Sequence, residues 1–161
     1  LLETILATKK EDVFFLIVGD GTEFSRMQEW FSIEKPNNAK LLQRLPKDDY
    51  DKLLAGCDVG LIFLDKKFLI PNFPSRLLSY LEMGIPVLAA TDTNTDIGDI
   101  VEQNSCGFKV ISGDQKEMQT KINLLLNSDL TVMGENAKQL LMSNYTVDKS
   151  YNLIMNKIKH V

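Results

Sequence analysis

The chain has 161 residues, of which 44% are hydrophobic and 25% charged, as is typical of one globular domain with one core. Its net charge of −4 and pI near 5.0 provide no basic face, which argues against nucleic acid as a partner. No apolar run approaches the roughly 18 residues of a membrane span and no signal-peptide pattern is present, so we expect a cytoplasmic protein. The only histidine is His160, and neither Cys57 nor Cys106 has a neighbour that completes a metal site, which argues against histidine-based catalysis and metal centres.

Hydrophobic patterns alternate between helix and strand along the whole chain. Residues 1–8 have the pattern of the end of an amphipathic helix without a start signal. The expected strands are 13–18, 40–43, 59–64, 86–90 and 107–111. The later helices are expected at 22–31, 47–55, 75–83, 97–103, 115–127, 130–143 and 147–159. This order predicts an α/β fold in which a doubly wound parallel sheet of about five strands has helices on both faces. We expect a single domain over residues 1–161, with ligands at the carboxyl ends of its strands.

The helix at 75–83 and the strand after it are the most informative segment. Pro74 suits the first turn of a helix and Gly84 suits the left-handed position just past its end. Residues 87–90 form the continuous apolar run expected of a parallel strand covered on both faces. The expected apolar face of the helix consists of Leu77, Leu78 and Leu81. Because the unpaired amides at the helix start lie next to Arg76, we expect this end to bind an anion such as a pyrophosphate.

Three segments together resemble a known family. They are residues 18–23 (Val-Gly-Asp-Gly-Thr-Glu), residues 45–64 and residues 74–89. In order and spacing they are similar to the C-terminal, donor-binding half of a GT-B glycosyltransferase of the family 4 type, and the resemblance covers nearly the whole chain. It implies a Rossmann-like half of a GT-B fold and sugar transfer from a nucleotide-sugar with retention. It also implies no cofactor or bound metal, an N-terminal acceptor-binding domain outside this chain, and a missing first strand that would precede Leu1.

The resemblance assigns the donor-binding residues one by one. Gly19 and Gly21 match a glycine loop that lets the backbone approach the ligand, although a plain tight turn explains such a pair equally well. Gln43 and Arg44 occupy the place of the nucleotide-base contact, and the alternative there is a solvated loop. The residues that face the diphosphate are Pro74, Ser75 and Arg76. Asp58 matches an acidic residue that is more often a cap or turn residue, so it is left out of the site.

The sequence departs from the family at its pair of glutamates. Counting back from Gly84, the position that binds the ribose hydroxyls holds Ser79, and the earlier position holds Pro71. Glu82 lies one turn beyond Ser79 and is a candidate for the ribose contact, as is the hydroxyl of Ser79 itself. The charged residues of the preceding loop, Asp65, Lys66 and Lys67, are further candidates for the missing role. No catalytic base is assigned.

We therefore expect the donor nucleotide-sugar-binding domain of a retaining hexosyl- or N-acetylhexosaminyltransferase, acting on a glycan or lipid-linked acceptor. The full-length enzyme is expected in the cytoplasm, with peripheral association at the inner face of the membrane, and this fragment is expected to be inactive alone. One alternative is a non-catalytic nucleotide-sugar-binding or interaction module, which the missing glutamates favour. Another is half of a sugar-nucleotide epimerase. A receiver domain is disfavoured because no acidic pair ends the first strand.

Overall fold

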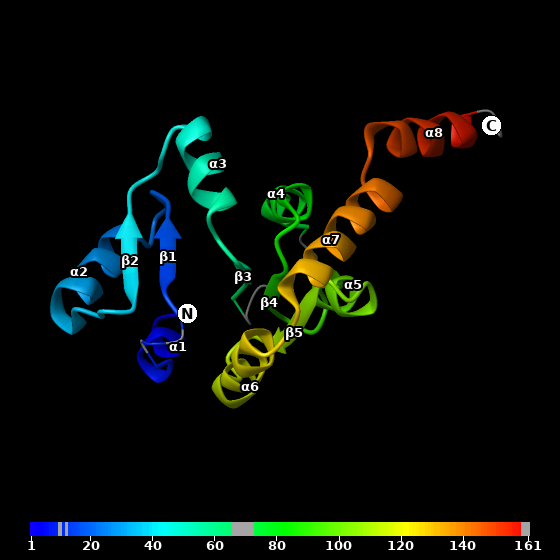
Figure 1. Cartoon of the computed structure of the whole chain (residues 1–161). Helices are drawn as coiled ribbons and strands as arrows, with labels where there is room; N and C mark the ends of the chain where they lie inside the picture. The colour runs from blue at the N-terminus through cyan, green and yellow to red at the C-terminus, as the bar shows by residue number, and fades with distance from the viewer. Residues whose placement is uncertain (10, 12, 66–72, 159–161) are drawn as a thin grey trace.

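Parallel strands and helices alternate along the chain, as the sequence predicts (Figure 1). The computed structural model describes all residues except 10, 12, 66–72 and 159–161. The strands are β1 (Phe15–Val18), β2 (Ala39–Leu42), β3 (Gly60–Phe63), β4 (Val87–Thr91) and β5 (Gly107–Ile111). Helices α1 (Leu2–Ala7), α2 (Phe24–Glu34), α3 (Lys47–Ala55), α4 (Ser75–Met83) and α5 (Ile97–Gln103) alternate with them, and α6 (Gln115–Leu126), α7 (Leu130–Asn144) and α8 (Val147–Ile158) follow.

Most element bounds agree with the sequence analysis. The structure reproduces the expected ranges of α3, α4, α5 and β5, and the other strands differ at their ends by a few residues. The largest difference among the helices is at α2, which begins at Phe24 and ends at Glu34, three residues later than expected. The expected helix at 147–159 ends on Lys159, which lies outside the described residues.

The expected α/β fold with five parallel strands is confirmed, and the described strands are paired in two sheets. The strands form a two-stranded parallel sheet, β1–β2, and a three-stranded parallel sheet in the order β3–β4–β5. In the first sheet Phe15 is paired with Ala39, and in the second Gly60 is paired with Val87 and Val87 with Gly107. Neither β1 nor β2 is hydrogen-bonded to a strand of the larger sheet. The sequence pattern identified the strands but could not show which of them are neighbours.

Two hydrophobic clusters cover opposite faces of β4. Successive side chains of a strand point to opposite faces, and Val87 and Ala89 belong to the cluster beneath α4, α5 and α7. Leu88 and Ala90 belong to the second cluster, which also contains residues of α1, α6 and both strands of the smaller sheet. This second cluster therefore joins the two sheets through their side chains.

The second cluster is reinforced by buried polar contacts of α1. The amide nitrogen of Asn38, the residue before β2, donates to the carbonyls of Ile5 and Thr8 at 2.9 and 3.1 Å. On the other side, the hydroxyl of Thr4 donates to Gln115 and the amide of Gln119 donates to the hydroxyl of Thr8. These contacts hold α1 between the smaller sheet and α6, in agreement with Figure 1.

Glycines fix the position of α4. Gly84 ends the helix in the left-handed conformation (φ 67°), as predicted from the sequence. A Cβ on Gly134 of α7 would lie 2.2 Å from the carbonyl oxygen of Gly84, so only glycine allows this approach of α7 to the end of α4. The buried face of α4 differs slightly from the expected one, because Tyr80 is buried with Leu77 and Leu81 while Leu78 is only half-buried.

The last helix, α8, contributes no buried residue. Its apolar side chains recur at helical spacing and are exposed, namely Val147, Tyr151, Ile154 and Ile158. Figure 1 shows α8 projecting away from the rest of the chain. Among the described residues, no helix is both long and apolar enough to cross a membrane.

Candidate functional site

The N-terminus of α4 carries no side-chain cap. Pro74 occupies the N-cap position, where it has neither an N–H nor a side-chain oxygen that could accept a hydrogen bond. The N–H of Leu77 donates to the carbonyl of Pro74 at 2.9 Å, whereas those of Ser75 and Arg76 donate to no described residue. Ser75 and Arg76 are both exposed. Two backbone donors at the positive end of the helix are therefore accessible to an anion.

The start of α4 also differs from the other described helix starts in its charge. Helices α6 and α7 begin at Asp114 and Asp129, whose carboxylates accept N–H groups of their own first turns. The remaining helices have an acidic residue at the N-cap or in the first turn. Helix α4 has none, and carries Arg76 there instead. The positive end of its dipole is thus not neutralised by the described chain, which suits an anionic ligand.

Arg76 lies within electrostatic reach of Tyr80, one turn further along α4. Burial raises the pKa of Tyr80 well above its usual value, and the Arg76 guanidinium opposes part of this rise. The Tyr80 hydroxyl donates to the carbonyl of Leu61 in β3 at 3.2 Å. The helix that carries Arg76 is therefore anchored to the larger sheet one turn from the proposed anion-binding end.

Gly19 and Gly21 follow β1, and the described fold does not require either to be glycine. Both have ordinary backbone angles, because Gly84 and Gly113 are the described glycines with positive φ. A Cβ added at either position would meet no atom within 4 Å. A tight turn usually requires glycine because of a positive φ or a close contact, and neither occurs at these two positions. The open space next to them is available to a ligand.

Arg44, after β2, reaches the glycine loop. Its guanidinium lies 3.9 Å from the carboxylate of Asp20, between the two glycines, and both side chains are largely exposed. Such an exposed pair contributes little stability, so Arg44 remains accessible for another anion. Gln43 is also exposed and lines a groove between α2 and β2 with Phe24 and Phe31. The structure thus brings Gly19, Gly21 and Arg44 together at the carboxyl ends of the strands of the smaller sheet.

The candidates for the ribose contact lie further along α4. Ser79 is half-buried and Glu82 is exposed. At 1.5 Å per residue, Glu82 lies about 10 Å along the helix from Ser75, and Ser79 about 6 Å. The pKa of Lys47 in α3 is raised, mainly by its hydrogen bond to Asp51, and the nearby Glu82 carboxylate contributes a smaller part of this rise. Both residues remain predictions for ribose binding.

For the other residues singled out from the sequence, the structure gives little support for a role in ligand binding. Asp58 is exposed. Lys66, Lys67 and Pro71 lie outside the described residues. The thiol of Cys57 contacts the carbonyl of Leu53, and burial raises its pKa. The thiol of Cys106 contacts the carbonyl of Val101, and burial raises its pKa to about 11, so burial disfavours the reactive thiolate form of both cysteines.

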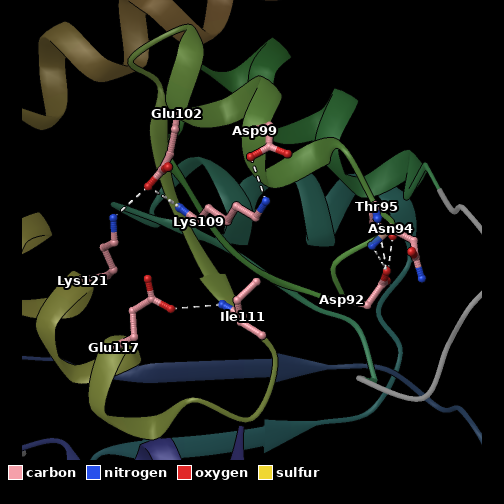
Figure 2. A network of polar contacts seen from close by, with 9 residues as sticks. All are labelled: Asp92, Asn94, Thr95, Asp99, Glu102, Lys109, Ile111, Glu117 and Lys121. Atoms are coloured by element: carbon pink, nitrogen blue, oxygen red, sulfur yellow. Dashed lines mark hydrogen bonds and ion pairs between the residues drawn. The ribbon is translucent and has the colours of Figure 1, made fainter.

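A polar turn at the carboxyl end of β4 was not identified from the sequence. The Asp92 carboxylate accepts the N–H groups of Asn94 and Thr95 at 2.6 and 3.1 Å and the Thr95 hydroxyl at 2.7 Å (Figure 2). These hydrogen bonds, that of the Thr95 hydroxyl first, lower the pKa of Asp92. Aspartate is common in turns that its own side chain closes, and this Asp-x-x-Thr spacing was the available signal. The turn fixes the chain between β4 and α5.

Acidic side chains also cover the outer edge of β5. Glu102 of α5 accepts the N–H of Lys109 at 3.0 Å, and Glu117 of α6 accepts that of Ile111 at 3.2 Å (Figure 2). Burial raises the pKa of Glu102, but its hydrogen bonds from Lys121 and from the Lys109 N–H outweigh this, so its pKa is lowered. No group of three or more potential metal ligands was found among the described residues. The expectation that no metal or cofactor is used stays a prediction.

Comparisons with known proteins show the family and the fold of the chain. A family model described as Glycosyl transferases group 1 matches residues 1–140. Among curated proteins, the chain is 23% identical over 146 residues to the probable glycosyltransferase WbjE of Pseudomonas aeruginosa, covering 91% of this chain and 36% of that protein.

Three solved structures have a similar fold. Anabaena HepE in complex with UDP-glucose has a TM-score of 0.77 at 20% identity and is matched over 100% of this chain and 44% of its own. A variant of S. aureus TarM in complex with fondaparinux, alpha-GlcNAc-glycerol and UDP has a TM-score of 0.74 at 16% identity, over 96% and 31%. WaaG, a glycosyltransferase involved in lipopolysaccharide biosynthesis, has a TM-score of 0.63 at 15% identity, over 89% and 38%. The chain thus has the α/β fold of GT-B glycosyltransferases and spans less than half the length of these relatives.

Proposed function

Because the chain belongs to the glycosyl transferases group 1 family, we propose that it is the C-terminal, donor-binding domain of a retaining glycosyltransferase of the family 4 type. The observation that carries this proposal is the start of α4. No described residue accepts the N–H groups of Ser75 and Arg76, and the first turn of α4 has no acidic residue, which suits the diphosphate of a nucleotide-sugar.

The same arrangement supports a mechanism for the departure of the nucleotide. When the bond between sugar and diphosphate breaks, negative charge builds up on the diphosphate oxygens. The amides of Ser75 and Arg76 and the Arg76 guanidinium would stabilise this charge as it develops, without reorganisation of solvent. We propose that the glycine loop at Gly19 and Gly21 lies against the donor and that Arg44 contacts its nucleotide. Ser79 and Glu82 are proposed for the ribose hydroxyls.

The choice of donor follows from the chemistry of similar proteins. The HepE structure contains UDP-glucose and the TarM structure contains UDP. We therefore propose a nucleoside diphosphate sugar, with UDP as the first nucleotide to test, and transfer of a hexosyl or N-acetylhexosaminyl group without a metal cofactor. The isolated chain is expected to bind nucleotide and not to form product, because the acceptor must be held by another domain.

We also propose that this acceptor domain belongs to the same protein. The exposed stripe of Val147, Tyr151, Ile154 and Ile158 on α8 supports a further intramolecular interface, since such apolar spacing is unusual on a solvated helix. Replacing Ile154 with Ser should lower the melting temperature of the full-length protein and leave that of this chain unchanged.

A glycan or lipid-linked acceptor would place the enzyme in the cytoplasm at the inner face of a membrane, which vesicle flotation of the full-length protein would test.

The first test of the proposal is a calorimetric titration with UDP, GDP and ADP. It should use both this chain and the full-length protein, with circular dichroism to show that each is folded. Saturable binding of one nucleotide by the full-length protein supports the donor-domain function and identifies the base. If the folded full-length protein binds none of the three, the donor-binding proposal is wrong.

The absence of the usual glutamates favours a second candidate function. With Ser79 in place of one and Pro71 in place of the other, the domain would bind a nucleotide-sugar and not catalyse transfer. Incubating the full-length protein with radiolabelled nucleotide-sugar and a glycan acceptor distinguishes the two functions. Labelled product identifies an enzyme, whereas binding without product identifies a non-catalytic module. Family membership favours either of these over the epimerase and receiver alternatives.

A further inference from the structure

Strand β5 is the last strand of the larger sheet in the described part of the chain. The N–H of Ser112, just after β5, donates to the carbonyl of Thr91 in β4 at 2.8 Å. Because successive N–H groups of a strand alternate in direction, those of Lys109 and Ile111 point away from β4. An outer edge with such groups is a template for pairing with another strand, and the aromatic and β-branched residues of β5 favour strand structure.

Two carboxylates accept these outward N–H groups (Figure 2). Glu102 accepts the N–H of Lys109 at 3.0 Å, and Glu117 accepts that of Ile111 at 3.2 Å. The two glutamates come from opposite faces of the sheet, because α5 belongs to the hydrophobic cluster on one face of β4 and α6 to the cluster on the other. Side chains thus reach over the edge from both faces and occupy the places where a further strand would accept hydrogen bonds.

Glu117 does not have the role that its position at the start of α6 predicts. Asp114 caps this helix by accepting the N–H of Glu117 at 2.9 Å. In a capping box, the glutamate at this position would accept the N–H of the cap residue in return. Here the N–H of Asp114 donates to the carbonyl of Ile111 at 3.0 Å, and Glu117 accepts the N–H of Ile111. Both outward backbone groups of Ile111 are therefore occupied by the chain itself.

Glu102 is held over the edge by neighbouring charges. It accepts a hydrogen bond from Lys121 of α6 at 2.8 Å, and Lys121 also lies 5.1 Å above the ring centre of Phe108. The ammonium group of Lys109 binds Asp99, one turn before Glu102 in α5, at 2.7 Å (Figure 2). Both lysine side chains are largely buried, so these ion pairs are less screened than exposed ones. The position of the Glu102 carboxylate is thus fixed by contacts with α6 as well as with β5.

We propose that Glu102 and Glu117 prevent β5 from pairing with the β5 strand of a second copy of this protein. A second copy is the partner expected once these carboxylates are removed, because it presents the same free edge. Two identical edges can meet antiparallel about a two-fold axis, which is the commonest symmetry of protein dimers. The N–H groups of Lys109 and Ile111 would then donate to the second copy instead of to the glutamates.

Light scattering of the full-length protein over a range of concentrations tests this proposal. With Glu102→Ala and Glu117→Ala combined, the measured mass should rise about twofold above that of the unsubstituted protein as the concentration increases. Circular dichroism shows whether the variant is folded. If it does not fold, Glu117→Ala alone, which leaves the contacts of Glu102 intact, is measured in the same way. A folded variant whose mass does not rise would overturn the proposal.

Two control variants separate the loss of the hydrogen bonds from the loss of charge. Glu34→Ala combined with Glu135→Ala removes the same charge from exposed positions of α2 and α7, and its mass should match that of the unsubstituted protein. Glu102→Gln combined with Glu117→Gln keeps an acceptor oxygen at each position and should also leave the mass unchanged. Association of either control to the same extent as the alanine variant would contradict the proposal.

Hydrogen exchange in the alanine variant shows which surface associates. The amides of Lys109 and Ile111 should exchange at least roughly tenfold more slowly at high than at low protein concentration, whereas the already paired amides of β4 should not change. Association without this protection would come from another surface and would overturn the proposal. These measurements need no nucleotide, so their results are independent of the proposed donor binding.

A proline at the edge provides a second localisation. Adding Lys109→Pro to the alanine variant removes an outward N–H and no hydrogen bond to β4, so it should return the mass to that of the unsubstituted protein. Continued association of the folded proline variant would contradict pairing through β5. If this variant does not fold, the exchange of Lys109 and Ile111 in the alanine variant decides.

Discussion

The ring of Tyr80 lies directly against the backbone of Gly60, where an added Cβ would come within 2.5 Å of a ring atom. This contact packs α4 onto β3, and the Tyr80 hydroxyl adds a hydrogen bond to Leu61 in the same strand. Gly60 leaves room for the ring of Tyr80, and this ring holds α4 against the sheet. Because the ring is buried, it has little freedom to move aside.

Gly60→Ala is expected to destabilise the domain by about 1 to 3 kcal/mol, because the methyl group would overlap the ring and force α4 or the ring to shift. Urea unfolding followed by circular dichroism measures the change. Gly56→Ala is the matched control, since its Cβ would meet only the Leu53 carbonyl at 3.5 Å, an ordinary contact. Equal midpoints for the two variants would show that the Tyr80 contact is not tight.

Arg76→Ala is expected to weaken nucleotide binding by the full-length protein by about 1.5 to 3 kcal/mol, because a charge-assisted hydrogen bond to the diphosphate is lost. Calorimetric titration gives the affinity. Lys52→Ala removes an exposed cation from the last turn of α3 and should leave the affinity unchanged. Unchanged affinity in Arg76→Ala would remove this residue from the site.

Gly21→Ala should separate ligand binding from folding. The position has an ordinary φ and open space around its Cβ, so the substitution should leave stability unchanged or raise it by about 0.4 to 1 kcal/mol. If the donor lies against this loop, the added methyl group should weaken nucleotide binding by about tenfold, or about 1.4 kcal/mol. A thermal melt and a titration on the same sample measure both effects, and unaltered affinity would leave the glycine with no role at the ligand.

Asp92 should make the domain sensitive to acid. Its pKa is lowered in the folded chain from the model-peptide value of 3.8, so the unfolded chain binds the proton more readily as the pH falls. The stability that Asp92 contributes is therefore complete above pH 3.8 and is lost as the pH falls through the folded-state pKa. Carboxylates titrate at roughly pH 3 to 5. Over this range the urea midpoint of Asp92→Asn should therefore fall less than that of the unsubstituted chain.

The comparison for this acid dependence is Asp58→Asn, which alters an exposed carboxylate for which the described structure gives no hydrogen bond or ion pair. Its acid profile should match that of the unsubstituted chain. An Asp92→Asn profile that also matches would mean that the turn between β4 and α5 does not contribute to acid stability.

Local sequence signals were sufficient where neighbouring residues decide the structure. Pro74 indicated the start of α4, because a proline has no N–H for a helical hydrogen bond. Gly84 indicated its end, because glycine readily adopts the left-handed conformation. The apolar run at 87–90 identified a buried strand because both of its faces are covered. The lack of an acidic residue at the start of α4, on which the proposed anion site depends, can also be read from the sequence.

Only the tertiary structure decided which of these elements meet. Strand neighbours depend on contacts between residues far apart in the chain, so the pattern could not show that, among the described strands, β1 pairs with β2 and β3 with β4. Likewise, the need for glycine at position 60 and the absence of such a need at 19 and 21 depend on what surrounds each Cβ. The sequence by itself thus determined the elements and the family resemblance, whereas packing between distant residues determined how the sheet divides and where space for a ligand remains.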